Sequence, residues 1–124
     1  MRLLEEDELY LTEKGYVFET VERGSELHVV IHNYPLPEAY TPQAVDLLIK
    51  IPPGYPNAKL DMFWTDPRVT LTAGSLPQAS AVFVNIGGKQ WQRWSRHWQN
   101  SWRAGVDGLE TYLGAVRHEL SKGI

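Results

Sequence analysis

Apolar residues recur along the chain with two different periods, and each period predicts one kind of element. Residues 27–32 alternate between apolar and other side chains, and residues 44–51 form a second, largely apolar run, so both segments are predicted to be strands. Later in the chain the apolar residues step by three and four, which predicts a helix over roughly 104–121. The residues that carry this helical period are Val106, Leu109, Leu113, Val116 and Leu120.

The remaining segments complete an α+β arrangement in one domain, residues 1–124. Residues 2–14 are predicted to form a short N-terminal helix that turns its leucines to the core and its acidic residues to water. Two further strands are predicted at 16–22 and 60–65, so the chain first builds a four-stranded antiparallel meander. Over 66–89 glycines and prolines interrupt short β-like pieces, and this segment is predicted to be an irregular flap of the kind that is often functional.

A stretch rich in tryptophan, residues 91–102, lies between the flap and the C-terminal helix. Four of the five tryptophans stand in it, at positions 91, 94, 98 and 102, and their steps of three, four and four indicate a helical stripe whose rings form walls of the core. The same stretch carries Ser95 and His97 two residues apart, among basic residues and without any acidic residue between positions 89 and 104. It is the strongest candidate for a functional site.

Composition and charge exclude several classes of function. The chain contains no cysteine, which removes disulfides, thiolate metal sites and every mechanism that uses a thiol. Its four histidines show no ligand-like spacing, so neither a metal nor another cofactor is expected. The formal net charge of −3 argues against a general nucleic-acid binder. No segment has the length of a membrane span and the N-terminus lacks the apolar core of a signal peptide, so a cytoplasmic location is expected.

Four short motifs resemble those of one protein family. They are Tyr-Pro-Leu-Pro at 34–37, Pro-Pro-Gly-Tyr-Pro at 52–56, Asp-Met-Phe-Trp at 61–64 and Trp-Gln-Arg-Trp-Ser-Arg-His at 91–97. In this order, and with Trp102 before the last helix, they look like prokaryotic ubiquitin-conjugating-like family E, a bacterial branch of the ubiquitin-conjugating enzyme superfamily. The resemblance covers most of the chain and implies the ubiquitin-conjugating-enzyme-like fold.

The resemblance also implies partners and a reaction. The expected partners are a ubiquitin-like modifier protein, an adenylating enzyme that activates this modifier, and a target protein, whereas neither nucleic acid nor a membrane is expected. Typical conjugating enzymes carry the modifier as a thioester on a cysteine that follows a His-Pro-Asn motif. This chain has neither the cysteine nor the motif, whose nearest substitute is Asn85-Ile86-Gly87. Its N-terminal helix is acidic, where that of the family is usually basic.

Ser95 stands nearest to the position of the missing cysteine. Counted back from Trp102, the matching window holds a tryptophan and Ser95, and only the serine can act as a nucleophile. A serine hydroxyl needs a positioned base, and the imidazole of His97 is the obvious candidate. If residues 94–98 are extended, the two side chains share a face, whereas in a helix they diverge by about 200°. We expect Ser95 to lie partly exposed on a groove, with the flanking tryptophans turned inward.

The other candidate residues each have a structural and a functional interpretation. Asn85 is either a donor to the tetrahedral oxyanion or a turn residue before two glycines. The residues predicted to bind the modifier are Arg93, Arg96, Trp91 and Trp98. If the serine is only a small polar residue, the chain is instead a binding module that holds the modifier or its activating enzyme. A binder of single-stranded nucleic acid, using tryptophans and arginines, is the third and weakest hypothesis.

Overall fold

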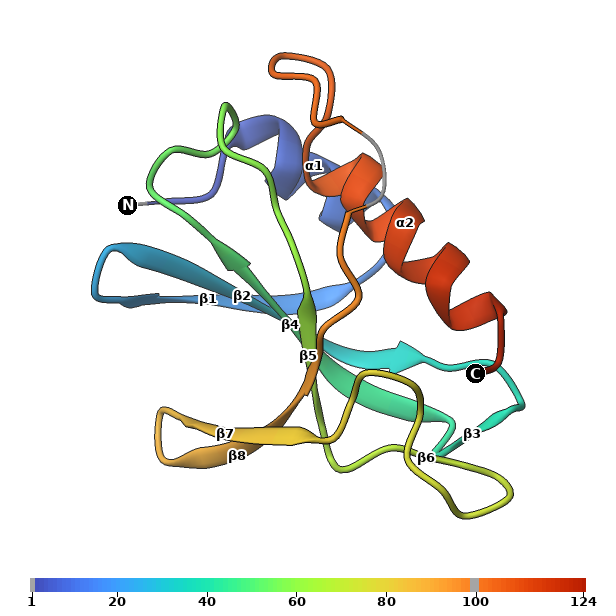
Figure 1. Ribbon diagram of the computed structural model, residues 1–124. Helices are drawn as coiled ribbons and strands as arrows, with labels where there is room; N and C mark the ends of the chain where they lie inside the picture. The colour runs from blue at the N-terminus through green and yellow to red at the C-terminus, as the bar shows by residue number, and fades with distance from the viewer. Residues whose placement is uncertain (1, 99–100) are drawn as a thin grey trace.

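The computed structural model describes residues 2–98 and 101–124, which form a curved antiparallel sheet with helices on one side (Figure 1). The helices are α1 (Glu5–Glu13) and α2 (Leu109–Ser121). The strands are β1 (Val17–Arg23), β2 (Glu26–Pro35), β3 (Tyr40–Thr41), β4 (Ala44–Ile51), β5 (Phe63–Asp66), β6 (Thr70–Leu71), β7 (Val82–Ile86) and β8 (Lys89–Trp94). The main sheet has the order β1-β2-β4-β5-β8-β7, and the short strands β3 and β6 pair with each other.

The α+β class and both terminal helices are confirmed, but the sheet is larger than predicted. The predicted strands at 16–22, 27–32, 44–51 and 60–65 correspond to β1, β2, β4 and β5, which are neighbours in the sheet. Two more strands extend this set, because residues 82–94 form the hairpin of β7 and β8, and β8 pairs antiparallel with β5. The sheet of described residues therefore has six strands rather than four.

Alternation along the strands gives the sheet two faces with separate hydrophobic clusters. Both helices pack on one face, and Figure 1 shows α1 and α2 on the same side of the strands. This face holds the main core, in which Ile31, Leu47 and Phe63 are almost completely buried. Successive strand residues point to opposite faces of the sheet. The strand residues that alternate with those of the main core therefore form a second cluster on the other face. Its buried members are Val30, Leu48, Trp64 and Trp91.

The helical stripe predicted for the tryptophans is wrong. Trp91 and Trp94 lie in β8, where residues three apart point to opposite faces of the sheet. Trp94 is 0% exposed in the main core and stacks on Phe63 with the ring centroids 5.2 Å apart, whereas Trp91 belongs to the second cluster. Pairing of β8 with both β5 and β7 overrides the apparent helical period, because tertiary context outweighs local pattern.

Two strands differ from the prediction where a residue adopts positive φ. β2 continues to Pro35 rather than ending at residue 32, because its register with β4 shifts at a bulge around Asn33, which has φ 58°. β5 begins at Phe63 rather than at residue 60, since Met62 has φ 59° and cannot continue an extended strand.

The C-terminal helix begins later than predicted. α2 starts at Leu109 rather than near residue 104, after Gly108, whose N–H donates to the Thr111 hydroxyl at 3.0 Å. Val106, predicted to face the core, therefore lies outside the helix and is 63% exposed. The apolar residues from Leu109 onward do form the buried face of α2, as their period indicates.

A buried hydrogen-bond network ties the proline-rich turn at 52–56 to both helices. The Tyr55 hydroxyl donates to Asp7 Oδ2 at 2.6 Å and accepts from the backbone N–H of Leu109 at 2.8 Å. The second bond satisfies an N–H that the first turn of α2 leaves without an intrahelical partner. Asp7 is buried, and burial raises the pKa of its carboxyl above the ordinary value of 3.8, although the hydrogen bond from Tyr55 opposes this effect.

The free energy of unfolding of the Asp7→Asn variant, relative to that of the wild type, is expected to increase as the pH rises. A raised pKa means that the folded state binds the proton of Asp7 more tightly than the unfolded state does. The wild-type free energy of unfolding therefore falls as the pH rises from below 3.8 through the folded-state pKa. An amide has no proton to lose there, and its oxygen still accepts from Tyr55. Urea unfolding at a series of pH values measures the difference, and a deficit of the variant that grows with pH would contradict the expectation.

Candidate functional site

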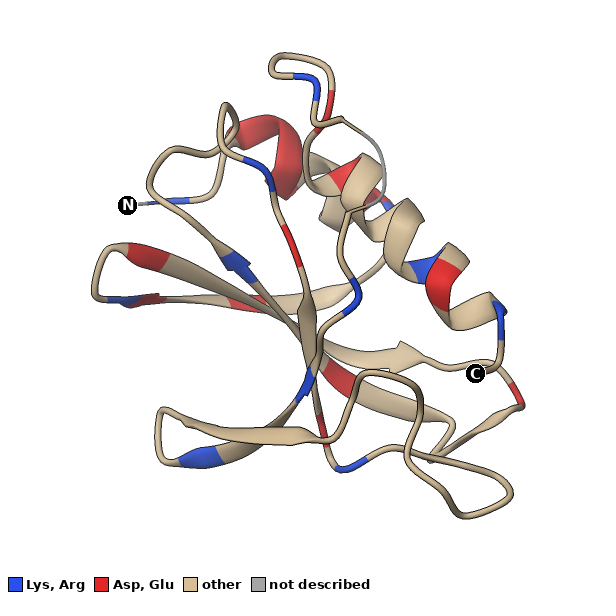
Figure 2. Cartoon of the chain, viewed as in Figure 1, with Lys and Arg blue, Asp and Glu red and all other residues tan. Residues whose placement is uncertain are grey.

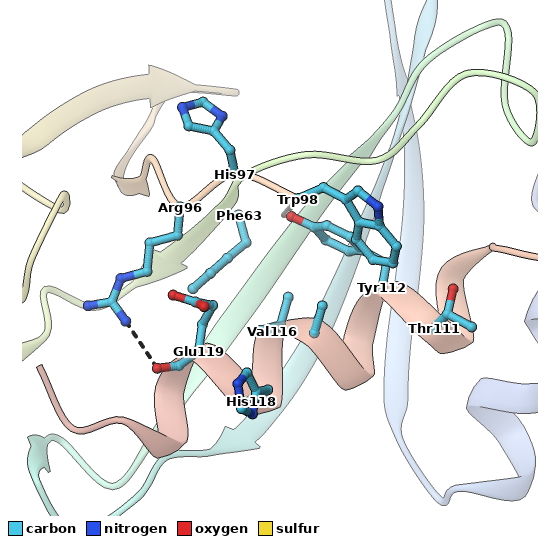
Figure 3. Close-up of a pocket in the computed structure, with 10 residues that line it drawn as sticks. Phe63, Arg96, His97, Trp98, Thr111, Tyr112, Val116, His118 and Glu119 are labelled. Carbon is cyan, nitrogen blue, oxygen red and sulfur yellow. Dashed lines mark hydrogen bonds between the residues drawn. The ribbon is translucent and has the colours of Figure 1, made fainter. Parts of the chain in front are cut away.

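Segment 95–98, which follows β8, alternates its side chains between two sides of the chain. Figure 3 shows Arg96 and Trp98 pointing toward α2 and His97 pointing away from it. The contacts agree, since Arg96 Nη1 donates to a backbone carbonyl of α2 and the Trp98 ring stacks on a tyrosine of α2. Such alternation is that of an extended chain, and the segment forms no helix. Of the two possibilities for Ser95 and His97, the structure thus shows the one in which they share a side.

Ser95 is half-buried and hydrogen-bonded at two points. Its backbone N–H donates to the carbonyl oxygen of Ala79 at 2.8 Å, which fastens the segment to the flap. Its Oγ accepts from Nε of Arg93 at 3.1 Å. Arg93, Ser95 and His97 are alternate residues of one extended stretch, which places them on the same side of it. A guanidinium that donates to a hydroxyl oxygen stabilises negative charge that develops there.

The imidazole of His97 is held by a carboxylate from another part of the chain. Its Nδ1 lies 2.9 Å from Oδ2 of Asp61, and the other oxygen, Oδ1, accepts from the backbone N–H of Trp98 at 2.8 Å. Burial alone would raise the pKa of Asp61, but these two hydrogen bonds and the nearby charges of His97 and Lys59 together hold the pKa below its ordinary value of 3.8. Sequence reasoning missed this contact because 36 residues separate the two side chains, and no local spacing signals it.

Backbone strain is concentrated around these residues. Among described residues other than glycine, only Asn33, Met62 and Ala79 have positive φ. Asn33 lies at the bulge of β2, whereas Met62 directly follows Asp61 and Ala79 accepts the hydrogen bond from Ser95. A positive φ at a residue other than glycine costs free energy. Such a conformation persists where the surrounding structure holds it, often at functional sites. The strain therefore lies in the two segments that contact residues 95–98, one through Ser95 and the other through His97 and Trp98.

Arg96, predicted to bind the modifier, is held by backbone carbonyls of the protein itself. It is only 9% exposed, and its guanidinium donates to the carbonyl oxygens of Gln78, Glu119 and Ile124, with the first two bonds 3.2 Å long. It also lies over the Trp94 ring, 4.9 Å from the centroid. These bonds occupy all three nitrogens of the guanidinium. Arg96 therefore joins the flap, α2 and the segment after β8, and its role in binding a modifier stays a prediction.

The two tryptophans predicted to bind the modifier are mainly packing residues. Trp91 is 5% exposed in the second cluster, with Lys89 Nζ 5.1 Å from the centroid of its ring. Trp98 is half-buried, stacks on Tyr112 at 6.0 Å and meets the edge of Trp102 at 5.2 Å. Of the pair, Trp98 retains accessible surface that a partner can contact. With Trp91 and Trp94 buried, the stretch offers only part of the stacking platform that the nucleic-acid hypothesis needs.

The oxyanion role predicted for Asn85 does not fit its position. Asn85 Oδ1 accepts from the backbone N–H of Gly88 at 3.1 Å and so closes the turn between β7 and β8. In the hairpin it lies opposite Gln90, five residues before Ser95 along β8. At about 3.3 Å per strand residue, this puts Asn85 on the order of 16 Å from the serine. The structural interpretation of Asn85, that of a turn residue, is the one that the contacts support.

A pocket lies beside this segment, between it and α2. It has a volume of about 310 Å³, and its apolar lining includes Phe63, Trp98, Tyr112 and Val116 (Figure 3). His97 also lines the pocket, although its imidazole points away from α2, whereas Ser95 is not among the lining residues. Basic residues lie along β8 and the segment after it, whereas acidic residues gather on α1 (Figure 2).

Comparisons with known proteins place the chain in a family. Neither α1 nor α2, the helices of the described residues, is long and apolar enough to cross a bilayer. No curated protein and no solved structure matches the chain. The sequence model of Prokaryotic E2 family E matches residues 3–123, nearly the whole chain. The chain therefore belongs to Prokaryotic E2 family E.

Proposed function

We propose that this protein accepts a ubiquitin-like modifier from an adenylating enzyme as an oxyester on Ser95, and then transfers it to a target. Membership in a family of prokaryotic E2-like proteins connects the chain to ubiquitin-like modifier pathways, and thus to a modifier and an activating enzyme as partners in general. The observation that supports the serine is the hydrogen bond that its Oγ accepts from Arg93 Nε at 3.1 Å. Ser95 also stands two residues before His97 in a segment that forms no helix, which favours a common side for the two side chains.

The proposed chemistry has two steps. In the first, Ser95 Oγ attacks the C-terminal carbonyl carbon of the adenylated modifier; a C–O bond forms, the acyl–phosphate bond breaks, AMP leaves, and His97 takes the hydroxyl proton. In the second, an amine or hydroxyl of the target attacks the ester carbonyl, the bond to Oγ breaks, and Oγ regains a proton. His97 can act in this way because neutral imidazole is a base near neutral pH.

Arg93 is proposed to stabilise the oxyanion, the role that the sequence suggested for Asn85, and to bind the modifier. It lies beside Ser95 and is half-buried, so its guanidinium can stabilise negative charge on Oγ or on the oxyanion of the tetrahedral intermediate. It can also bind a carbonyl oxygen of the modifier's tail, the role predicted from the sequence. A hydrogen bond from the charged guanidinium is expected to stabilise this negative charge more than a hydrogen bond from a neutral amide at the same place would.

A binding module without catalysis is the second candidate function. The observation that favours it is the absence of cysteine from a chain of this family. In that case the protein holds the modifier or its activating enzyme without forming a covalent bond. The four exposed acidic residues of α1 would then suit a basic partner surface better than they suit the usual acidic one.

Intact mass spectrometry distinguishes the two functions. The protein is incubated with a ubiquitin-like protein, an adenylating enzyme from the same genome, and ATP. A covalent adduct is expected whose mass equals the sum of both chains less one water, which survives thiols and breaks in hydroxylamine because it is an oxyester. The matched control omits ATP and should give no adduct. Tight binding measured by calorimetry without any adduct would instead establish the binding module.

A further inference from the structure

Asp61 bridges the segment that carries the proposed base. Its carboxylate uses both oxygens there, Oδ2 toward Nδ1 of His97 at 2.9 Å and Oδ1 toward the N–H of Trp98 at 2.8 Å. It comes from the stretch before β5, whereas Ser95 and His97 follow β8, the neighbouring strand. The contact thus joins two strand ends at the side of the sheet where the proposed nucleophile lies.

We infer that Asp61 is a positioning residue that fixes the orientation and the tautomer of His97, an inference that rests on the proposed function. A neutral imidazole carries its proton on one nitrogen and a lone pair on the other. A carboxylate can only accept, so the proton lies on Nδ1 and the lone pair on Nε2, the nitrogen that serves as the base. When that base takes the proton of Ser95, the same carboxylate stabilises the imidazolium.

The surroundings of Asp61 restrict its movement. The next residue, Met62, has φ 59°, and its carbonyl oxygen accepts from the Tyr112 hydroxyl of α2. The other charged group near the carboxylate is Lys59, whose Nζ lies 3.9 Å from Oδ2 and is exposed on the surface. Asp61 itself is about three quarters buried, its side chain being 24% exposed. A carboxylate held by backbone on one oxygen can orient a ring on the other, which is how a positioned site is built.

The inference can be tested without the natural partners, with a fluorophosphonate probe that reacts with activated serines. Ser95 Oγ attacks phosphorus, the P–F bond breaks, fluoride leaves and the proton passes to His97, so the labelling rate reports the base. Asp61→Asn is expected to slow labelling by roughly 10²-fold or more, because an amide can also hold the wrong tautomer.

Two comparisons separate positioning from a structural effect. Asp66→Asn removes a carboxylate at the far end of β5 that pairs with Lys89 at 2.9 Å, and it should leave the labelling rate and its pH profile unchanged. In the His97→Ala background, Asp61→Asn should cause no further slowing, because it acts through the ring. Equal slowing in both backgrounds would overturn the inference.

Ring-nitrogen NMR decides the matter independently of Ser95. Long-range ¹H–¹⁵N spectra distinguish an imidazole protonated on Nδ1 from one protonated on Nε2. Wild-type His97 is expected to show the Nδ1–H form, and Asp61→Asn is expected to lose that preference. A wild-type ring protonated on Nε2 would refute the positioning role. Failure of the probe to label wild-type Ser95, with the Nδ1–H form present, would refute the proposed nucleophile and leave the orientation by Asp61 established.

Discussion

Replacing Ser95 with alanine is expected to abolish the covalent adduct with the modifier completely. The adduct requires an oxygen nucleophile at this position, and the methyl group of the variant supplies none. Ser95→Cys is expected to accept the modifier again, now as a thioester that thiols cleave, since a thiolate is the better nucleophile. The serine is half-buried and its Oγ already accepts from Arg93, so a sulfur of similar shape keeps the same surroundings.

Intact mass spectrometry of the wild type, Ser95→Ala and Ser95→Cys measures these outcomes. Ser101→Ala is the matched control, because Ser101 is exposed and also follows β8, and its adduct should equal that of the wild type. Thermal unfolding of each variant shows whether the fold is retained. An undiminished adduct on Ser95→Ala would place the modifier on another residue and end the assignment of Ser95 as nucleophile.

The substitution Arg96→Ala is expected to lower the free energy of unfolding by about 3 kcal/mol or more. It removes hydrogen bonds from a charged donor to three backbone carbonyls, and such bonds each contribute on the order of 1.5–3 kcal/mol. The carbonyls of Gln78 and Glu119 lose their donor, and the Trp94 ring loses the guanidinium that covers it. A loss of this size is a large fraction of the stability of an ordinary domain.

Urea unfolding followed by tryptophan fluorescence measures the effect. Arg96→Lys should also lose much of the stability, because an ammonium cannot reach three separate carbonyls with the fork of a guanidinium. Arg93→Ala is the control, since Arg93 is half-buried and its Nε donates to the single hydroxyl of Ser95; the substitution should cost far less stability. If Arg96→Ala lowers the free energy of unfolding by less than about 1 kcal/mol, the structural role of Arg96 is contradicted.

The candidate site depends on contacts between segments that lie far apart in the chain. Ser95 is fastened to Ala79 in the flap, and His97 is held by Asp61 before β5. Each link joins β8 to a segment with positive φ, at Ala79 or at Met62. Disturbing either segment is therefore expected to change the site without touching the serine, as in many sites where the backbone is strained.

Local pattern determined the parts of this protein that depend on neighbouring residues. The apolar period from Leu109 to Leu120 predicted α2, which buries one apolar face, and residues 44–51 are β4 as predicted, because a short, largely apolar run is typical of a strand buried on both faces. The motifs at 34–37, 52–56, 61–64 and 91–97 pointed to the family that the comparison then showed over 3–123. The absence of cysteine, visible in the sequence, left Ser95 as the proposed nucleophile.

Tertiary structure alone decided what each residue of the tryptophan stretch does. The steps between Trp91, Trp94 and Trp98 fit a helix, yet pairing with β5 and β7 made the first two strand residues on opposite faces. Likewise, a basic stretch cannot reveal that Arg96 is buried against three carbonyls, or that Asp61 reaches His97 across 36 residues. Sequence period records which side chains share a face of a local element, whereas strand pairing and long-range hydrogen bonds depend on where the rest of the chain folds.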